Sequence, residues 1–387
     1  MKTNDTIKLF ADAHVFDGKF QGSRTFIKEL YTIIAAMNNV QLYLGAYNTS
    51  NLEKCFGSNN NICFVKYSST SAFIRLAYDI PRIIKKHQIN YAHFQYITPP
   101  YKNCRFIVTT HDLLFNEFPK EFPFFYRLVK NFLFKQSAKW ADILTTVSTY
   151  SKGSIQKYFS ISAAAIHIIP NGVSNLFFAN YDKESAKQYI KTKFGVDKII
   201  LLVSRHEPRK NHILLLQAFL DLELYQQGYH LVLLGWHENI NNPVFNHMMN
   251  NLPEKSKPFI FMHQNADDAD LLQFYRAAQV FVYPSKAEGF GIPPLEAAAV
   301  KIPVLCSNSA AMSDFTFFGT NHFDPGNYPL FKNKLAAIAN AEPDTTELEN
   351  IAAIVKQRYN WQQAAAALHQ LIKTDWERST AGAVKNN

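Results

Sequence analysis

Two stretches of the sequence place charged side chains directly after apolar runs. The first follows the run Ile199–Val203 and contains Arg205, Arg209 and Lys210. Arginine offers a bidentate fork and lysine a point charge, and both residue types bind phosphate groups. Three cations in a strand-to-helix loop therefore predict an anion site. The alternative is a solvated loop whose ion pairs run through Glu207.

The second stretch, Pro284–Ala297, combines two acidic residues with glycine and proline. Carboxylates accept hydrogen bonds from sugar hydroxyls, so Glu288 and Glu296 could hold two different sugars of one ligand. Gly289 and Gly291 would let a ligand approach the backbone closely. The alternatives are that Glu296 compensates a helix dipole and that the glycines only serve a turn.

Rigid elements must position these loops, and the sequence alternates short apolar runs with helix-length segments such as Thr25–Met37 and Asn211–Leu222. This alternation is typical of doubly wound parallel sheets covered by helices on both faces. Such sheets bind ligands at the carboxyl ends of their strands. The predicted strands form two sets: Ile7–Ala11, Val40–Leu44, Tyr91–Phe94, Phe106–Thr110, Ile143–Val147 and Ile166–Ile169, then Ile199–Val203, His230–Leu234, Phe259–Met262, Val280–Val282 and Val304–Cys306.

Length and composition suit two such sets. The chain has 387 residues, of which 47% are hydrophobic and 18% charged, enough for two buried cores and too few charges for a disordered chain. A polar, lysine-rich stretch at 180–198 separates the sets and predicts a hinge. We therefore expect an N-terminal domain over 1–178 and a second domain over 195–360.

The sequence also indicates a cellular location. No apolar run reaches the ~18 residues of a membrane-spanning helix, and the N-terminus lacks a signal-peptide core. We therefore expect a cytoplasmic protein. The four cysteines are scattered and form no CxxC pair, so neither a zinc site nor a disulfide framework is indicated.

The formal net charge of +9 is compatible with three kinds of binding partner: nucleic acid, an anionic membrane or phosphorylated ligands. No lysine- and arginine-rich block of the nucleic-acid kind occurs. The segment Phe122–Trp140 mixes aromatic and basic residues, as helices at a membrane interface do. A core-facing helix with a solvated basic edge explains the segment equally well.

The string Glu288-Gly289-Phe290-Gly291-Ile292-Pro293, followed by Leu295-Glu296-Ala297, resembles the E-x7-E signature of retaining GT-B glycosyltransferases of family 4. Further segments resemble the family in the same order along the chain: Gly18–Phe26, Thr110-His111-Asp112, Thr146–Ser151, Ile168–Val173, Ser204–Asn211, Phe323–Gly326 and Tyr359–Trp361. The resemblance implies two Rossmann-like domains with an interdomain cleft, the first binding the acceptor and the second the nucleotide sugar. It also implies a last helix at 361–378 that crosses back to the first domain.

The resemblance also implies roles for single residues. Arg205 and Lys210 would hold the diphosphate of a nucleotide sugar, with Arg209 sharing that role. Glu288 would contact the transferred sugar, and Glu296 the ribose. Glu288, His111, Arg205 and Lys210 would be the catalytic residues.

Other positions would line the ligands. His111 would reach the donor sugar from the first domain, His263 would lie beside the base, and the backbone from Gly289 through Phe290 to Gly291 would face sugar and phosphate. Gly22 and Arg24 would lie near acceptor and phosphate, although Phe20–Arg24 departs from the double glycine of the family. Lys301 stands where the family usually has glycine.

The resemblance is to mannosyl- and rhamnosyltransferases of bacterial surface polysaccharides. It implies transfer of a hexose, with GDP-mannose favoured over UDP- and dTDP-sugars, to a glycan or lipid-linked acceptor of a cell-surface polysaccharide. The configuration at the transferred carbon would be retained. No cofactor and no metal are expected, because Asp268-Ala269-Asp270 opens a helix and is explained by capping. Alternatives are another GT-B activity, such as a phosphorylase or epimerase, and a non-catalytic sugar-nucleotide-binding scaffold.

Overall fold

The computed structural model describes residues 6–18, 22–235, 242–264 and 266–384 of the chain. The chain forms two compact units. Residues 1–171 and 361–387 make up the first, and residues 172–360 the second. The last helix, α15 (Trp361–Val384), therefore belongs to the first unit although it follows the second in sequence.

The first unit is built on a parallel sheet of seven strands in the order β3-β2-β1-β4-β5-β6-β7. Phe10, Phe94 and Phe106 on neighbouring strands pack against Ile80 and Ile84 of helix α4 (Ile80–His87). Near-continuous burial of the central strands explains their unbroken apolar sequence. The strands are β1 (Ile7–Asp12), β2 (Val40–Ala46), β3 (Ile62–Lys66), β4 (Tyr91–Gln95), β5 (Arg105–Thr109), β6 (Ile143–Thr146) and β7 (Ile166–Ile168).

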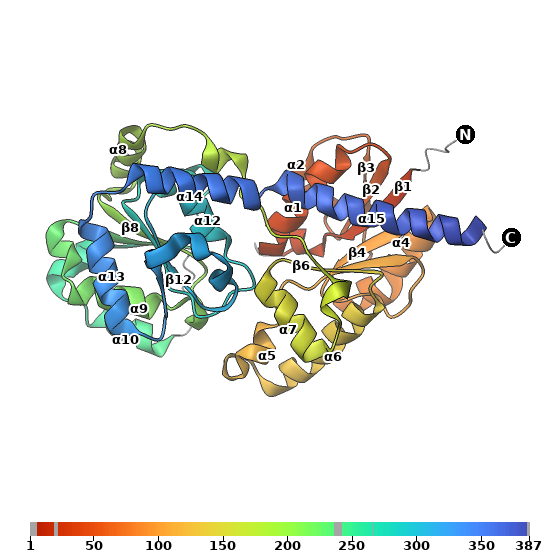
Figure 1. Ribbon diagram of the computed structural model, residues 1–387, viewed down its shortest axis with the longest axis horizontal. Coiled ribbons are helices and arrows are strands. Elements are labelled where there is room, and N and C mark those ends of the chain that lie inside the picture. Colours follow the sequence, from red (N-terminus) through yellow and green to blue (C-terminus); the bar gives the residue numbers. More distant parts are fainter. Residues whose placement is uncertain (1–5, 19–21, 236–241, 265, 385–387) are drawn as a thin grey trace. The chain divides into compact units, whose positions relative to one another are not determined.

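Helices cover this sheet, and Figure 1 shows α15 running beside α1 (Gly22–Ala35). The contact begins where the Trp361 ring meets Phe26, with centroids 6.1 Å apart. Further along α15, Asp375 accepts a hydrogen bond of 2.7 Å from the Tyr91 hydroxyl. The other main helices of the unit are α2 (Thr49–Phe56), α4 (Ile80–His87), α6 (Phe124–Trp140) and α7 (Thr149–Phe159).

The second unit repeats the plan with a parallel sheet in the order β10-β9-β8-β11-β12-β13. Its strands are β8 (Ile199–Val203), β9 (His230–Leu234), β10 (Ile260–His263), β11 (Val280–Tyr283), β12 (Val304–Ser307) and β13 (His322–Phe323). Its longer helices are α8 (Lys183–Phe194), α9 (His212–Asp221), α10 (Pro243–Asn250), α11 (Asp268–Ala277), α12 (Ile292–Ala299), α13 (Tyr328–Asn340) and α14 (Thr345–Arg358). The prediction of two doubly wound α/β units is confirmed, and the structure adds β3 and β13 to the predicted strands.

The lysine-rich stretch expected to link the units contains helix α8, which belongs to the second unit. Asp182 caps this helix by accepting from the backbone nitrogens of Glu184 and Ser185. Only Ala186 and Ile190 of its side chains are buried, and the helix packs against α11. The polar composition therefore reflects an exposed helix, and the boundary between the units falls earlier, at residues 171 and 172.

Candidate active site

The basic loop of the second unit follows β8 at the carboxyl edge of the sheet. A short 3-10 turn over Pro208–Lys210 precedes α9, and Asn211 joins the two with a φ of 58°. Within this loop the Lys210 side chain is buried, whereas the Arg205 side chain is 52% exposed. The three predicted phosphate-binding cations thus differ sharply in their access to solvent.

The acidic loop follows β11 at the same edge, next to β8. Gly291 ends the loop with a φ of 100° and is the N-cap residue of α12. A Cβ atom there would also lie 3.3 Å from the Phe315 ring. Both the backbone conformation and the close approach require glycine at this position.

Glu288 joins the two loops through a buried network. Its Oε1 accepts from the Lys210 ammonium and, at 2.7 Å, from the Ser285 hydroxyl. Its Oε2 lies 3.0 Å from the Arg209 guanidinium. The Tyr283 hydroxyl, at the end of β11, donates to Oε1 over 3.1 Å. The structure therefore brings the basic and acidic loops into direct contact.

Backbone hydrogen bonds fix this contact. The Lys286 amide donates to the Arg209 carbonyl oxygen over 2.7 Å, and the Arg209 guanidinium donates to the Ala287 carbonyl oxygen over 2.8 Å. Each loop thus holds the other through main-chain atoms as well as side chains. Such a pre-organised site loses little conformational entropy when a ligand binds.

Burial alone would raise the pKa of Glu288, but the charges of Lys210 and Arg209 hold it at about 2. Burial lowers the pKa of Lys210, while Glu288 opposes that shift. Glu288 is consequently a carboxylate at neutral pH, which accepts hydrogen bonds and does not donate a proton.

Glu207 bridges the two arginines of the basic loop. It lies 2.8 Å from Arg205 and 2.6 Å from Arg209. The ion pairs through Glu207 that the sequence offered as an alternative are therefore present. They coexist with the contacts to Glu288, because Arg209 uses one terminal nitrogen for each acid.

Glu296 lies on α12 in a different environment from Glu288. It is half-buried, and it accepts a hydrogen bond of 2.7 Å from the hydroxyl of the buried Tyr275. Burial raises the pKa of Glu296 to about 7, with Asp268 adding to the shift and Tyr275 opposing it. The two acids of one motif thus have opposite pKa shifts.

The remaining residues predicted to bind the nucleotide sugar lie outside the Glu288 network. The Phe290 ring is buried against Phe315 and Tyr359, so only its backbone remains for a ligand. His263 ends β10, two strands from β8, and its ring lies near Phe261 and Phe194. No contact between His263 and Glu288 is present among the described residues.

His111 lies in the first unit, after β5. Its Nε2 is hydrogen-bonded to Gln95, and its ring stands edge-on to Phe26 at 5.0 Å. Burial lowers the pKa of this imidazole to about 4, so it is neutral at physiological pH. The Ser151 hydroxyl donates to the His111 carbonyl oxygen over 2.8 Å.

Gly22 and Arg24 lie in the first turn of α1. The Arg24 guanidinium stacks over the Phe16 ring at 4.9 Å. Part of the predicted loop, Phe20 and Gln21, lies outside the described residues, as does Asn265 beside His263.

The D-x-D sequence has a structural role in helix α11. Asp267 caps the helix by accepting from the Asp270 amide, and Asp270 itself accepts from Lys193 and Tyr189. Across the described parts of the chain, no group of three or more histidine, cysteine or acidic side chains is placed to hold a metal ion.

Comparisons with known families match both units. The model "Glycosyltransferase Family 4" matches residues 22–175, and the model "Glycosyl transferases group 1" matches residues 183–353. Between them they cover most of the two sheets and both charged loops. The chain belongs to glycosyltransferase family 4.

Curated relatives of this glycosyltransferase include O-antigen chain mannosyltransferase B of Escherichia coli. It is 26% identical over 292 residues, which cover 73% of this chain and 69% of the relative. O-antigen chain mannosyltransferase RfbU of Salmonella typhimurium is 28% identical over 247 residues, or 64% of each chain. The glycosyltransferase thus resembles proteins named as O-antigen mannosyltransferases.

Solved structures share its fold. Sucrose-phosphate synthase from Thermosynechococcus elongatus superposes with a TM-score of 0.78, covering 96% of this chain and 100% of that one at 17% identity. HepE of Anabaena, in complex with UDP-glucose, superposes with a TM-score of 0.71, covering 95% and 100% at 15% identity. The fold of the glycosyltransferase is therefore GT-B, as the motifs predicted.

Three residues of the site carried no assigned role in the sequence prediction. Tyr283 and Ser285 hydrogen-bond Glu288, and Tyr275 hydrogen-bonds Glu296. A signal existed for the first two, because they flank the end of the strand just before the acidic motif. Tyr275 lies 21 residues before Glu296 on another helix, and nothing in its surroundings distinguishes it in sequence.

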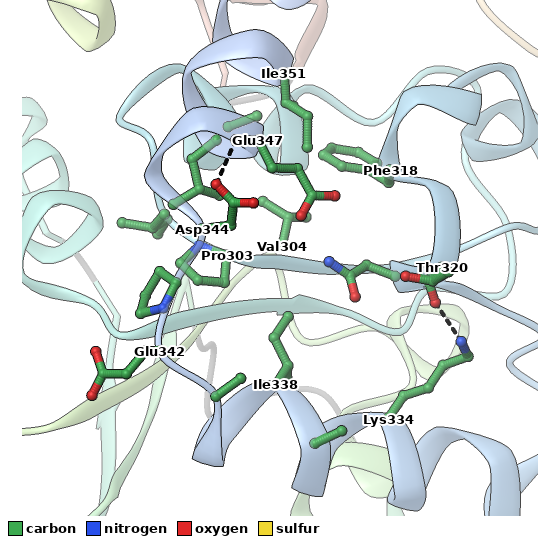
Figure 2. A pocket seen from close by; sticks show the side chains of 17 residues that line it. Pro303, Val304, Phe318, Thr320, Lys334, Ile338, Glu342, Asp344, Glu347 and Ile351 are labelled. Atoms are coloured by element: carbon green, nitrogen blue, oxygen red, sulfur yellow. Dashed lines mark hydrogen bonds between the residues drawn. The ribbon is translucent and has the colours of Figure 1, made fainter.

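A cavity of about 410 Å³ lies at the opposite edge of the second sheet, where β12 begins. Figure 2 shows Pro303, Val304 and Ile338 on its walls, with Glu342 and Lys334 at either side. None of the predicted donor residues lines it. This cavity is therefore separate from the charged loops.

Helix α6 exposes an apolar stripe. Phe124, Phe125, Leu128, Val129 and Phe132 recur at helical spacing and are all exposed, with Phe125 at 79% and Phe132 at 68%. The opposite side, with Phe134 and Ala138, is buried in the core. A core-facing helix with only a basic edge exposed does not describe this arrangement. Among the described residues, every helix is too short or too polar to span a bilayer.

Proposed function

We propose that this glycosyltransferase moves a mannosyl group from GDP-mannose to a glycan or lipid-linked acceptor of a cell-surface polysaccharide, with retention of configuration and without a metal ion. The observation that carries the proposal is the buried contact of Lys210 and Arg209 with Glu288. It puts groups suited to a diphosphate and a group suited to sugar hydroxyls within one network. The proposal for mannose rests on the names of the relatives.

The leaving group of such a transfer is a nucleoside diphosphate, whose negative charge must be neutralised as the bond to the sugar breaks. Arg205 is the most exposed of the three cations and pairs with Glu207 near the surface, so it can turn to a phosphate at little cost. Lys210 is already desolvated, so its charge acts more strongly on a phosphate than an exposed charge would. The amino end of α9 points to the same edge and adds its dipole.

Glu288 is ionised, and its oxygens already accept from the donors of the network. When a phosphate draws Lys210 and Arg209 toward itself, the carboxylate becomes available to accept from hydroxyls of the transferred sugar. Ligand binding would then exchange one set of charge-assisted hydrogen bonds for another, and the buried carboxylate would not be left without partners.

Retention requires the acceptor hydroxyl to attack from the face that the phosphate leaves. The departing phosphate oxygen can take the proton of that hydroxyl, so no protein base is needed. The pKa values fit this scheme, because Glu288 is held at about 2 and His111 at about 4. His111 would instead donate or accept a hydrogen bond to the sugar as a neutral imidazole.

A lipid-linked acceptor would suit the apolar stripe of α6. Lys135 and Lys139 follow Phe132 by three and seven positions, the spacing of one helix face, so cations adjoin the exposed aromatic side chains. Aromatic side chains beside lysines favour the interface of an anionic bilayer. We propose this surface as the membrane contact of a peripheral, cytoplasmic enzyme.

Turnover of a nucleotide-sugar panel tests the donor. The purified chain should bind and slowly hydrolyse GDP-mannose in preference to UDP- and dTDP-sugars, and product NMR should show the α-anomer first. Arg205→Ala and Lys210→Ala should each lower turnover sharply, whereas Lys255→Ala, at an exposed lysine, should not. Binding without turnover would favour a scaffold, and wild-type turnover in both variants would remove the phosphate assignment.

Vesicle sedimentation tests the membrane contact. The chain should pellet with vesicles containing phosphatidylglycerol and less with phosphatidylcholine alone. The double variant Phe125→Ser/Phe132→Ser should stay in solution, while Val244→Ser, an exposed apolar residue on α10, should behave as the wild type. Equal sedimentation of the double variant and the wild type would contradict the proposal.

A further inference from the structure

Gln95 is the last residue of β4, and its side chain reaches His111, which follows the neighbouring strand β5. The amide oxygen of Gln95 is hydrogen-bonded to Nε2 of the imidazole. Gln95 is buried, so this oxygen would lose its hydration without gaining a partner if the bond were absent. The donor network in the second unit and the apolar stripe of α6 do not involve this glutamine.

The bond to Gln95 decides which ring nitrogen of His111 carries a hydrogen. An amide oxygen can only accept, so Nε2 must be the donor. Because burial holds the pKa of His111 at about 4, the ring is neutral at physiological pH and has a single N–H. With that hydrogen on Nε2, the other ring nitrogen, Nδ1, keeps its lone pair and can only accept a hydrogen bond.

Neighbouring groups hold the imidazole in this orientation. The Phe26 ring stands edge-on to it at 5.0 Å, and the Tyr96 ring lies at 5.3 Å with its plane tilted by 52°. The Ser151 hydroxyl fixes the backbone of His111 through its carbonyl oxygen. Among the described residues no donor is hydrogen-bonded to Nδ1, and the side chain is only half-buried, so this nitrogen remains for a ligand.

Sugar hydroxyls can donate or accept hydrogen bonds, but opposite a nitrogen that only accepts, a hydroxyl must donate. We propose that Gln95 is a positioning residue, which holds His111 as the Nε2–H tautomer so that Nδ1 accepts from a hydroxyl of the transferred sugar. The inference rests on the proposed function, since it gives the direction of the hydrogen bond between His111 and that sugar. A sugar lacking the hydroxyl would leave Nδ1 without a partner, so Gln95 contributes to the choice of donor.

Nitrogen-15 NMR of the histidine rings tests the tautomer in the ligand-free chain, with His111→Asn identifying the His111 signals. In the wild type, Nε2 should appear as a protonated nitrogen and Nδ1 as an unprotonated one. Gln95→Met removes the acceptor at similar side-chain size and should give a mixture of both tautomers. Gln95→Glu keeps an acceptor oxygen and should restore the wild-type pattern above neutral pH. A protonated Nδ1 in the wild type, or an unchanged tautomer in Gln95→Met, overturns the inference.

Hydrolysis of GDP-mannose tests whether the tautomer serves the sugar. Gln95→Met should lower kcat/KM by up to about tenfold, the value of one hydrogen bond, and Gln95→Glu should recover most of the loss. Gln156→Met, at an exposed glutamine of α7, is the matched control and should behave as the wild type. When the sugar hydroxyls are replaced one at a time by fluorine, which cannot donate, one replacement should weaken binding more in the wild type than in Gln95→Met.

The two measurements separate this inference from the proposed function. A wild type that hydrolyses no GDP-mannose, yet shows an Nε2–H tautomer that Gln95→Met loses, would contradict the proposed function and leave the tautomer assignment standing. Normal hydrolysis by the wild type, with an equal kcat/KM in Gln95→Met, would contradict the role of Gln95 alone.

Discussion

Glu288 in the second unit and Asp12 in the first are two buried carboxylates in similar surroundings. Each accepts from a tyrosine hydroxyl, Tyr283 for one and Tyr67 for the other. Each is paired with two basic side chains, and in each case these neighbours hold the pKa at about 2 against burial. Local electrostatics alone would not tell which of them meets a ligand.

The two carboxylates differ in the backbone element to which each belongs. Asp12 is the last residue of a strand in the middle of its sheet, with a strand on either side. Glu288 lies in a loop between β11 and α12, where Gly289 and Gly291 follow it. A carboxylate fixed in a strand serves as a support, whereas one in a loop beside the cations that we propose for phosphate binding can change partners. We infer that the same ionic cluster is structural in one unit and functional in the other.

Glu288→Gln should have the largest effect. The change leaves the buried Lys210 without its anion, while Arg209 keeps its pair with Glu207, and we expect it to lower the free energy of unfolding by about 3 kcal/mol. Loss of the contact to the sugar should lower kcat by about 10²-fold or more. Urea denaturation and donor hydrolysis measure the two effects, with Glu254→Gln on the surface as control. Turnover near that of the wild type would place Glu288 with Asp12 as a support.

Asp12→Asn should lower stability by about 2 kcal/mol, the value of a pKa held near 2 instead of 3.8. Because the folded pKa is depressed, this contribution is present above pH 3.8 and is lost as pH falls through 2. GDP-mannose hydrolysis at neutral pH should stay within about twofold of the wild type when the chain is folded. If hydrolysis instead fell as far as in Glu288→Gln, the two clusters would not differ in role.

Glu296 differs from both Glu288 and Asp12, because its pKa is raised to about 7 instead of being lowered. Its neutral form stabilises the fold fully below pH 4.5, and that contribution is lost as pH rises through 7. Ribose hydroxyls donate to the carboxylate form, so GDP binding should release a proton and tighten as pH rises from about 6 to 8. The affinity for GDP should rise by up to about tenfold for each unit by which GDP binding lowers the pKa of Glu296. Calorimetry in two buffers measures the released proton, and Glu296→Gln should abolish it. A flat affinity profile in the wild type would contradict the ribose assignment.

Tyr283→Phe and Tyr67→Phe form the finest comparison. Each removes one hydrogen bond to a buried carboxylate and should lower the free energy of unfolding by about 1 kcal/mol. Only Tyr283→Phe should change the kinetic constants for the donor, raising KM several-fold, because we propose that Glu288 meets the sugar and Asp12 does not. Equal kinetic constants in the two variants would mean that neither tyrosine acts through a ligand-binding acid.

Much of the fold could be predicted from the sequence, because strands buried on both faces have continuous apolar sequences. The missed strands show the limit of this signal. β3 lies at the sheet edge with half-buried residues, and β13 is two residues long, so neither gives a full apolar run. The sequence of helix α8 is typical of a linker, because the helix buries only two of its side chains.

The convergence of the two charged motifs was predictable, because each motif is short and follows a strand. Arg205, Lys210, Glu288 and Glu296 lie in two short motifs after two strands, and the sheet rule places both motifs at one edge. The partners of those residues were not predictable. Tyr275 reaches Glu296 from a different helix, and Asp12 gathers Tyr67 and Arg75 across 55 and 63 positions of the chain, as its hydrogen bond and ion pair show.

The fold class, the family and the two charged motifs follow from the order of residues alone, because all three depend on short-range patterns of residue type. Three further properties exist only once the chain is folded: Lys210 and Arg209 pair with Glu288, Glu288 and Glu296 have opposite pKa shifts, and the aromatic side of α6 is exposed. A charge or a ring takes its properties from its neighbours in space and from its distance to water. Folding determines these neighbours and this distance, and the spacing of residues along the chain does not.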